Sequence, residues 1–303
     1  MGKLYDCIII GSGPAGLTAA IYAARACLSV LVLEKEFVSG GQVVNTYEVD
    51  NYPGYRGISG FDLGMKFREH AEKLDVEFVM EAVERVDLEK EEKIIYTDQS
   101  EYHGRTVILA MGASHRKLEV RGEEDFSGMG VSYCATCDGA FFKGKTVAVV
   151  GGGDVAIEDA IFLSRGCEKV YLIHRRDELR AAKSLQKKLM ALPNVEIIWD
   201  TVVNEICGED QVEALFIENK KTGAKKHLPV DGVFVAVGMK PNTNMVPDEI
   251  KKDEAGYIVA DENCVTNVTG IFAAGDVRTK MLRQIITAAA DGANAVESVQ
   301  HSI

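Results

Sequence analysis

The chain has 303 residues, the length of about two domains of roughly 150 residues each. Hydrophobic residues make up 47% and charged residues 26%, a balance that is typical of folded globular proteins and excludes a disordered or fibrous chain. With 46 acidic and 34 basic side chains the formal net charge is -12, so the surface repels phosphate backbones and we expect no nucleic-acid partner.

The hydropathy pattern and the cysteines indicate the compartment. No apolar run approaches the roughly 18 residues of a transmembrane helix, and the short apolar stretch before Gly11 lacks the length and cleavage site of a secretory signal. We therefore expect a cytoplasmic protein without a membrane partner. The seven cysteines are odd in number and unevenly spread, and only Cys134 and Cys137 have a spacing that suggests chemistry. Most of the others are expected to be buried thiols that fill the core rather than bind a ligand: Cys7, Cys27, Cys167, Cys207 and Cys264.

One sequence pattern occurs twice. Residues 7–35 and 147–175 align without a gap at an offset of 140. Each contains a short apolar run, a glycine-rich turn, a stretch rich in small residues and a second apolar run, which predicts one βαβ unit. A single glycine-rich loop is a weak signal, but two copies in matching contexts predict an α/β fold with two Rossmann-like dinucleotide-binding domains.

The glycines of these loops have mechanical roles. Gly11 makes the tight turn after the strand, Gly13 lets the backbone approach a pyrophosphate, and Gly16 lets the helix lie close to the strand. The same positions in the second copy are Gly151, Gly153 and Ala156. The pyrophosphate then meets the free N–H groups at the N-terminus of the helix.

The end of the second strand distinguishes the two copies. In the first copy Glu34 is placed to accept hydrogen bonds from the ribose hydroxyls of FAD or NAD. In the second copy a basic group replaces the acid and favours the 2′-phosphate of NADPH. That group consists of His174, Arg175, Arg176 and Arg180. The alternative is that these residues form a solvated basic patch without a ligand. The position of the basic group at the end of the strand argues against this alternative.

Other segments complete the two domains. Residues 107–113 and 233–239 predict buried strands that end beside a ligand, and residues 270–276 predict a strand that ends in Gly275 and Asp276. A helix is expected from about Gln284, with its positive end toward a bound group. We expect residues 114–244 to be inserted between residues 1–113 and 245–303. Segments 76–109 and 195–235 predict β-meanders, with strands at 77–80 and 196–199.

The pair Cys134 and Cys137 lies just before the second dinucleotide strand. Two thiols with two residues between them close a small disulfide if the first turn of a helix holds them. Asp138 is placed to deliver a proton when a thiolate leaves. A zinc site needs about four ligands, and neither a second pair nor a nearby histidine is evident, so no metal is expected. An inert thiol pair is the other alternative to a redox-active one.

These motifs together resemble the low-molecular-weight thioredoxin reductases of bacteria and archaea over nearly the whole chain. The resemblance is carried by residues 11–16, 40–42, 51–54, 134–138, 151–153, 174–176 with 180, 274–276 and 283–284. It implies a homodimer with one non-covalent FAD per subunit, a FAD-binding domain of residues 1–113 and 245–303, and an NADPH-binding domain of residues 114–244. The implied activity is reduction of thioredoxin by NADPH through FAD and the cysteine pair.

The resemblance also implies a role for each matching residue. Cys137 faces the flavin, Cys134 attacks the partner disulfide, and Asp138 donates the proton. The residues implied for FAD are Gly11, Ser12, Gly13, Pro14, Ala15, Gly16, Glu34, Lys35, Gly41, Gln42, Asn51, Val83, Gly112, Gly275, Asp276, Arg283, Gln284 and Ile285. Those implied for NADPH are Gly151, Gly153, Asp154, Val155, His174, Arg175, Arg176 and Arg180.

Three departures from the family pattern concern the nucleotide sites. Val155 stands where Ser or Thr is usual, so one hydrogen bond to the NADPH phosphate is missing. Asp159 replaces a common Glu, and Met111 replaces a common Thr. None of the three touches the thiol pair.

Three alternative functions stay open at this stage. One is a related flavin disulfide reductase that serves a glutaredoxin-like protein or a peroxiredoxin. Another is an enzyme that takes its electrons from reduced ferredoxin instead of NADPH. The cluster of three arginines argues against this donor. A non-enzymatic flavoprotein would not need the cysteine pair. Because one flavin face cannot hold nicotinamide and disulfide together, we also expect the inserted domain to rotate about its two joints.

Overall fold

The computed structural model describes residues 3–46, 48–88 and 92–303, and the chain divides into two compact units. The first contains the residues up to Ser114 together with Lys240–Ile303, and the second is His115–Met239. The sequence placed the joints at 113/114 and 244/245. The segments β7 (Ala113–His115) and β16 (Met239–Pro241) lie at the joints and form a two-stranded sheet.

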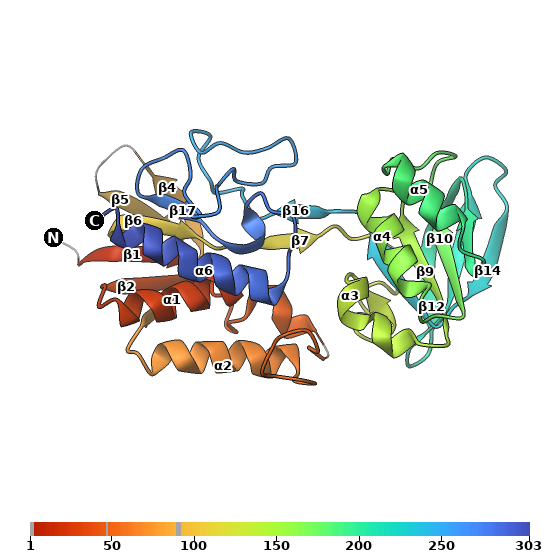
Figure 1. Ribbon diagram of the computed structural model, residues 1–303, viewed down its shortest axis with the longest axis horizontal. Coiled ribbons are helices and arrows are strands. Elements are labelled where there is room, and N and C mark those ends of the chain that lie inside the picture. The colour runs from red at the N-terminus through yellow and green to blue at the C-terminus, as the bar shows by residue number, and fades with distance from the viewer. Residues whose placement is uncertain (1–2, 47, 89–91) are drawn as a thin grey trace. The chain divides into compact units, whose positions relative to one another are not determined.

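The first unit is built on a seven-stranded sheet in the order β3-β2-β1-β6-β5-β4, with β17 also paired to β6 (Figure 1). Its strands are β1 (Leu4–Ile10), β2 (Val30–Glu34), β3 (Glu77–Met80), β4 (Val83–Asp87), β5 (Lys93–Thr97), β6 (Glu101–Leu109) and β17 (Ile271–Ala273). Its helices are α1 (Pro14–Arg25), α2 (Gly60–Glu72) and α6 (Ile285–Gln300), with short 3-10 turns η1 (Gly41–Asn45) and η3 (Gly275–Val277).

The parallel part of this sheet is buried on both faces, which explains its nearly continuous apolar runs. Along β1, Cys7 and Ile9 belong to the core on the face covered by α1 and α6, while Ile8 and Ile10 belong to the core on the opposite face. Strands β1, β2, β3 and β17 run parallel to their neighbours, so their carboxyl ends meet at one edge. By the general rule for α/β sheets, this edge is where ligands bind.

The second unit has a five-stranded parallel sheet in the order β11-β10-β9-β15-β8. These strands are β8 (Val131–Ser132), β9 (Thr146–Gly151), β10 (Lys169–Ile173), β11 (Val195–Ile198) and β15 (Gly232–Ala236). The antiparallel strands of a second sheet are β12 (Thr201–Gly208), β13 (Val212–Asn219) and β14 (Lys225–Pro229). The helical segments are α3 (Ala135–Asp138), η2 (Gly139–Phe142), α4 (Asp154–Leu163) and α5 (Lys183–Met190).

The sheets and helices of the second unit form three layers. Val147 and Val149 of β9 pack toward α4, and the alternating Ala148 and Val150 pack toward the β12–β14 sheet. The central strand is therefore buried on both sides.

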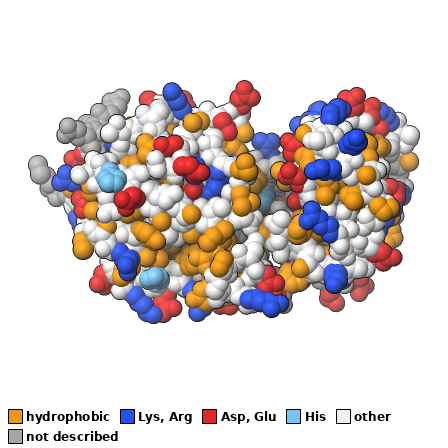
Figure 2. Space-filling view, in the orientation of Figure 1, with side chains coloured by type: hydrophobic (Ala, Val, Ile, Leu, Met, Phe, Trp, Pro, Cys, Tyr) orange, Lys and Arg blue, Asp and Glu red, His pale blue; other side chains and the backbone are white. Residues whose placement is uncertain are grey.

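On the face drawn in Figure 2, acidic and basic side chains are interspersed over the described surface rather than segregated by sign.

The expected α/β fold with two dinucleotide-binding βαβ units is confirmed, as is the helix after Gln284. The assignment of residues 77–80 and 196–199 to β-meanders was wrong. Residues 77–80 are the strand β3 and residues 196–198 belong to the strand β11, while Trp199 lies in a turn; β3 pairs in parallel with β2, and β11 pairs in parallel with β10. Each extends a Rossmann-like sheet at its edge, because a crossover connection precedes it. The antiparallel parts begin later, at β4 and β12.

The expectation that most of the remaining cysteines are buried holds for three of the five, and a core position was wrong for Cys27 and Cys207. Cys7, Cys167 and Cys264 are buried, Cys207 is half-buried, and Cys27 is exposed. Cys27 follows the C-cap of α1 and has a φ of 59°, the left-handed conformation common just after a helix. Its amide donates to the carbonyl oxygen of Ala24 at 3.0 Å, so the turn that ends the helix exposes this side chain.

Candidate active site

The first glycine-rich loop joins β1 to α1 at the carboxyl edge of the sheet. Gly11 has a φ of 100°, and a Cβ there would lie 2.6 Å from the carbonyl oxygen of Ala110, so no larger residue fits. Gly13 is the N-cap of α1, no side chain caps the helix, and Pro14 begins it. The first amides of α1 are therefore available to an anion such as a pyrophosphate.

Glu34, at the end of β2, is tied to this loop. Its Oε2 atom accepts hydrogen bonds from the amide and the hydroxyl of Ser12, at 2.8 and 2.7 Å, and its Oε1 atom accepts from the amide of Glu36 at 3.0 Å. Ser12 is fully buried. The carboxylate therefore fixes the loop in addition to presenting an acceptor at the expected ribose position. The neighbouring Lys35 is exposed, with Glu36 as its partner at 3.3 Å.

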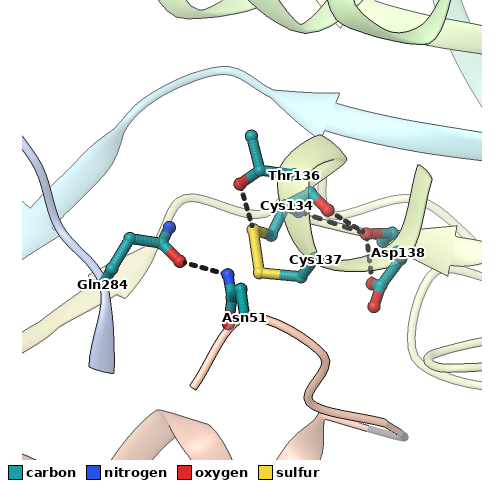
Figure 3. Close-up of a disulfide and its surroundings, with 7 residues drawn as sticks. Asn51, Cys134, Thr136, Cys137, Asp138 and Gln284 are labelled. Carbon is teal, nitrogen blue, oxygen red and sulfur yellow. Dashed lines mark hydrogen bonds between the residues drawn. A yellow bond between two sulfur atoms is a disulfide. The ribbon is translucent and has the colours of Figure 1, made fainter. Parts of the chain in front are cut away.

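Further segments of the same unit reach the loop. A Cβ on Gly41 would lie 3.3 Å from the Cα atom of Gly13, so η1 begins against the loop. Gln42 donates from its side-chain amide to the carbonyl oxygen of Ala113, just past Gly112. Asn51 donates from Nδ2 to Oε1 of Gln284 at 2.8 Å (Figure 3). The structure thus brings residues of four separate segments toward one edge of the first sheet. Val83 follows the carboxyl end of β3, and Ile285 begins α6.

Asp276 presents an acceptor without a partner. Its Oδ1 atom is buried and has no hydrogen-bond partner among the described residues. Burial raises the pKa of the Asp276 carboxyl, while the positive charges of Lys280 and Arg283 oppose that shift. Buried acceptors in native proteins are nearly always paired, so this oxygen indicates a missing donor such as a ligand hydroxyl. A buried carboxylate oxygen without a protein donor fits the expected role of Asp276 toward FAD.

The second glycine-rich loop joins β9 to α4 in the same manner. Gly153 is the N-cap of α4 and no side chain caps the helix, so its first amides are also open to a phosphate. Asp154 accepts a hydrogen bond from the amide of Ala182 at 2.8 Å. Val155 is 60% exposed in the first turn, where its side chain offers no donor to a phosphate.

The basic group after β10 separates into two kinds of residue. His174 is 4% exposed, its Nε2 atom is 3.0 Å from the carbonyl oxygen of Glu178, and its ring lies directly beneath Gly152. Its position supports the loop from inside rather than from the ligand side. Arg175, Arg176 and Arg180 are exposed, and within the described ranges none of their guanidinium groups has a side-chain partner. They are free to bind an anion.

Cys134 and Cys137 form a disulfide, with 5.3 Å between their Cα atoms. Cys134 is the N-cap of α3, and its carbonyl oxygen accepts hydrogen bonds from the amides of Cys137 and Asp138 at 3.2 and 3.1 Å. The expected helical turn thus holds the two sulfurs together. The Thr136 hydroxyl lies 3.4 Å from the Cys134 sulfur (Figure 3). Both cysteines are half-buried, so the bond is partly accessible.

Ser132 links the disulfide to Asp138, which the sequence did not predict. Its hydroxyl donates to Oδ2 of Asp138 at 2.6 Å and accepts from the amide of Cys134 at 3.1 Å. Ser132 is 4% exposed. Burial raises the pKa of the Asp138 carboxyl, and the Ser132 hydrogen bond partly opposes that shift. Asp138 therefore keeps its proton to higher pH than an ordinary carboxyl, as a proton donor should.

The disulfide and the second glycine-rich loop share one edge of one sheet. Ser132 ends β8 and Gly151 ends β9, and both strands pair in parallel with β15, which lies between them. The carboxyl edge of the five-stranded sheet therefore carries both the thiol chemistry and a nucleotide loop. Among the described residues, no group of three or more metal-ligating side chains forms a metal site. None of the helices in those ranges has the length and apolarity to cross a bilayer.

Comparison with known proteins places this arrangement in a family. The family described as pyridine nucleotide-disulphide oxidoreductase matches residues 5–292. The chain belongs to the pyridine nucleotide-disulphide oxidoreductase family. Members of this family are oxidoreductases that use a flavin and a nicotinamide nucleotide, in agreement with the two open helix N-termini.

Several of the similar relatives are thioredoxin reductases. The chain is 48% identical over 299 residues to a thioredoxin reductase of Listeria innocua, covering 98% of this chain and 93% of the relative. It is 45% identical over 302 residues to one from Bacillus subtilis, covering 99% and 95%. A crystal structure of a thioredoxin reductase from Streptococcus pyogenes has 49% identity and a TM-score of 0.94, over 100% of this chain and 99% of that one. The family expected from the motifs is confirmed.

Proposed function

We propose that this oxidoreductase is an NADPH-dependent thioredoxin reductase that works through FAD and the Cys134–Cys137 disulfide. The observation that carries the proposal is a closed disulfide on α3, with the Asp138 carboxyl held beside it by Ser132, on the sheet edge that also carries the second glycine-rich loop. Relatives with 45–48% identity over nearly the whole chain bear the same activity in their names.

FAD is proposed to bind the first unit. The open amides of α1 would hold its pyrophosphate, and Glu34 would accept from the adenosine ribose. Asp276 would accept a hydrogen bond from a ligand hydroxyl, which supplies the donor that its buried Oδ1 atom lacks. The remaining residues predicted from the sequence for FAD belong to the same proposal, Val83 and Lys35 included.

NADPH is proposed to bind the second unit. The amides at the start of α4 would hold its pyrophosphate, and three exposed arginines would recognise the 2′-phosphate. Among the residues that the structure describes, Arg175, Arg176 and Arg180 have no carboxylate partners that a phosphate would need to displace. This availability also favours NADPH over reduced ferredoxin as the donor.

The chemistry at the disulfide follows from its neighbours. When bound, FAD supplies a relay for two electrons from the nicotinamide to the disulfide. Uptake of those electrons breaks the Cys134–Cys137 bond and, with two protons, leaves two thiols. Cys134 then loses its proton to solvent, and the resulting thiolate attacks one sulfur of the thioredoxin disulfide, while the other thioredoxin sulfur leaves as a thiolate. Asp138 protonates the leaving thiolate.

The second exchange restores the starting state. Cys137 attacks the Cys134 sulfur of the mixed disulfide, so the internal disulfide forms again and the second thioredoxin thiol is released. Electrons balance, because the chain loses the two that thioredoxin gains. Ser132 holds Asp138 and the backbone of Cys134 through both steps.

The oligomeric state, the compartment and the domain motion are also proposals. We infer a homodimer that works in the cytoplasm, where thioredoxin is kept reduced. We also infer that the second unit rotates about the segments β7 and β16. This rotation would bring the NADPH site and the Cys134–Cys137 pair to the flavin in turn.

Steady-state reduction of thioredoxin with NADPH and with NADH tests the proposal. The purified yellow protein should reduce thioredoxin with a clear preference for NADPH, and Cys134→Ser should abolish that activity. A glutaredoxin-like protein and a peroxiredoxin should be run beside thioredoxin, since a better rate with either would reassign the partner. A colourless protein that takes up no FAD would overturn the flavin part.

A further inference from the structure

A charged cluster is buried behind the turn that carries Asp276. It consists of Asp291 in the middle of α6 together with Arg278 and Lys280, whose side chains are 6%, 6% and 7% exposed. None of these three residues belongs to a motif that the sequence singled out. Charged side chains are rarely buried to this extent unless they are paired, and an interior aspartate in a helix has to find partners outside it.

The Asp291 carboxylate accepts four hydrogen bonds. Its Oδ2 atom accepts from the amide of Gly275 at 2.9 Å, from Nε of Arg278 at 2.9 Å and from Nζ of Lys280 at 2.8 Å. Its Oδ1 atom accepts from Nη2 of Arg278 at 2.8 Å. One side chain therefore fixes both ends of the segment from Gly275 to Lys280.

This segment is held against the first nucleotide helix. Gly275 has a φ of 79°, and a Cβ there would lie 2.9 Å from the Cβ of Ala15 in the first turn of α1. Arg278 also donates from its amide to the carbonyl oxygen of Gly275 at 3.3 Å, which closes the turn. Asp276 directly follows Gly275 in this turn, and its buried Oδ1 atom has no partner among the described residues. The direction of that carboxylate thus depends on the cluster.

The charges of the cluster do not cancel. Two cations face one buried anion, and the second carboxylate near Arg278 is that of Glu262, which is 3.9 Å away and 95% exposed. Water screens such an exposed group, so among the three members of the cluster one positive charge is in excess. Burial and, to a smaller extent, the charge of Asp291 raise the pKa of the Asp276 carboxyl, and the charge of Lys280 opposes that rise and so favours the ionised form. An ionised carboxylate is the stronger hydrogen-bond acceptor.

We propose that Asp291, Arg278 and Lys280 form a positioning cluster for the flavin nucleotide, which fixes the Gly275–Asp276 turn against α1 and keeps an Asp276 oxygen available as an acceptor. The inference rests on the proposed FAD site. Buried ion pairs are weak sources of stability compared with apolar residues of similar size, so a role in holding the turn accounts better for this cluster than fold stability does.

The test uses the full chain and measures FAD affinity of the apoprotein by flavin fluorescence, together with thermal unfolding and the flavin reduction potential. Asp291→Asn keeps the shape but removes the charge that three donors share, so FAD binding should weaken by about tenfold or more. Glu69→Gln is the matched control, because it makes the same acid-to-amide change beside a lysine on the exposed face of α2. Its FAD affinity should stay within about twofold of the wild type.

A neutral cluster separates positioning from folding. The triple variant Arg278→Met, Lys280→Met and Asp291→Leu should fold about as well as the wild type, since apolar replacement of buried ions is tolerated. It should nevertheless bind FAD about tenfold more weakly and show a more negative flavin potential, because the internal positive charge is gone. Lys280→Met alone, which leaves the Arg278–Asp291 pair neutral, should weaken binding by about threefold and shift the potential in the same direction.

The possible outcomes are distinct. If wild-type apoprotein fails to bind FAD, the proposed function fails before the cluster is tested. If the wild type binds FAD and the folded variants bind it equally well with unchanged potentials, the positioning role is refuted. If Asp291→Asn does not fold, the FAD affinity and flavin potential of the triple variant test the positioning role. If the triple variant does not fold either, the same two measurements on Lys280→Met test it.

Discussion

Replacing Ser132 by alanine tests the proton-donor arrangement in most detail. The Ser132 hydroxyl lies 2.6 Å from Oδ2 of Asp138 and also accepts the Cys134 amide, so the substitution removes two hydrogen bonds at a site that is 4% exposed. A hydrogen bond between uncharged groups contributes about 0.5–1.5 kcal/mol, which corresponds to roughly 2- to 10-fold in the population of correctly oriented, protonated Asp138. We therefore expect kcat for thioredoxin reduction to fall by about that factor.

The same substitution shifts the pH profile in a defined direction. Asp138 acts in its protonated form, so activity falls as pH rises through its pKa. The Ser132 hydrogen bond lowers the pKa that burial raises, so Ser132→Ala should raise the pKa further and move the alkaline fall in activity to higher pH. Asp138→Asn should remove that fall together with most of the activity.

The assay separates the two halves of the reaction. Stopped-flow reduction of the flavin by NADPH should be unchanged in Ser132→Ala, whereas steady-state thioredoxin reduction should be slow. Ser164→Ala is the control, because it removes a serine hydroxyl that donates to a backbone carbonyl oxygen at the end of α4 in the same unit. Wild-type kcat and an unshifted pH profile in Ser132→Ala would refute the reasoning.

Three further predictions concern the second unit. Replacing Arg175 and Arg176 by alanine should narrow the ratio of kcat/KM for NADPH over NADH by about 10- to 100-fold, since each contributes a charge-assisted hydrogen bond; an unchanged ratio would show that the arginines are merely solvated. Val155→Thr should lower KM for NADPH by about fivefold, because the introduced hydroxyl can donate to the phosphate; a KM equal to that of the wild type would exclude that contact. Burial, with a smaller contribution from the charge of Glu158, raises the pKa of Asp159 from 3.8 to about 7. The folded state then holds a proton that the unfolded state has lost, so stability should fall by about 4 kcal/mol as pH rises from about 4 to about 7, and Asp159→Asn should remove that fall in urea unfolding. Parallel curves for variant and wild type would contradict the assignment.

Local sequence patterns were sufficient for the two βαβ units and for the cysteine pair. A tight turn such as that at Gly11 has to be made by glycine, and a helix that starts without a capping side chain is visible as a glycine at its N-cap. The disulfide spans a single helical turn, so its closure depends on residues within the motif. These features are encoded over a few neighbouring residues, which is why they could be predicted.

Features that depend on packing could not be predicted. The burial of His174 depends on where the loop at Gly152 crosses its ring, and the role of Ser132 depends on how β8 ends next to α3. The buried cluster joins Asp291 to Arg278 only because α6 folds back on the η3 turn. A carboxylate such as Glu34 was recognised as a ribose acceptor, but its hold on Ser12 requires the folded loop.

Counting electrons tests the central claim most directly. In an anaerobic reductive titration monitored by flavin absorbance, the wild-type chain should take up twice as many electrons per flavin as Cys137→Ser, because the disulfide accepts a pair in addition to the flavin. The variant flavin should still be reduced by NADPH, while thioredoxin reduction stops. Equal electron uptake by the two proteins would contradict a redox-active Cys134–Cys137 pair.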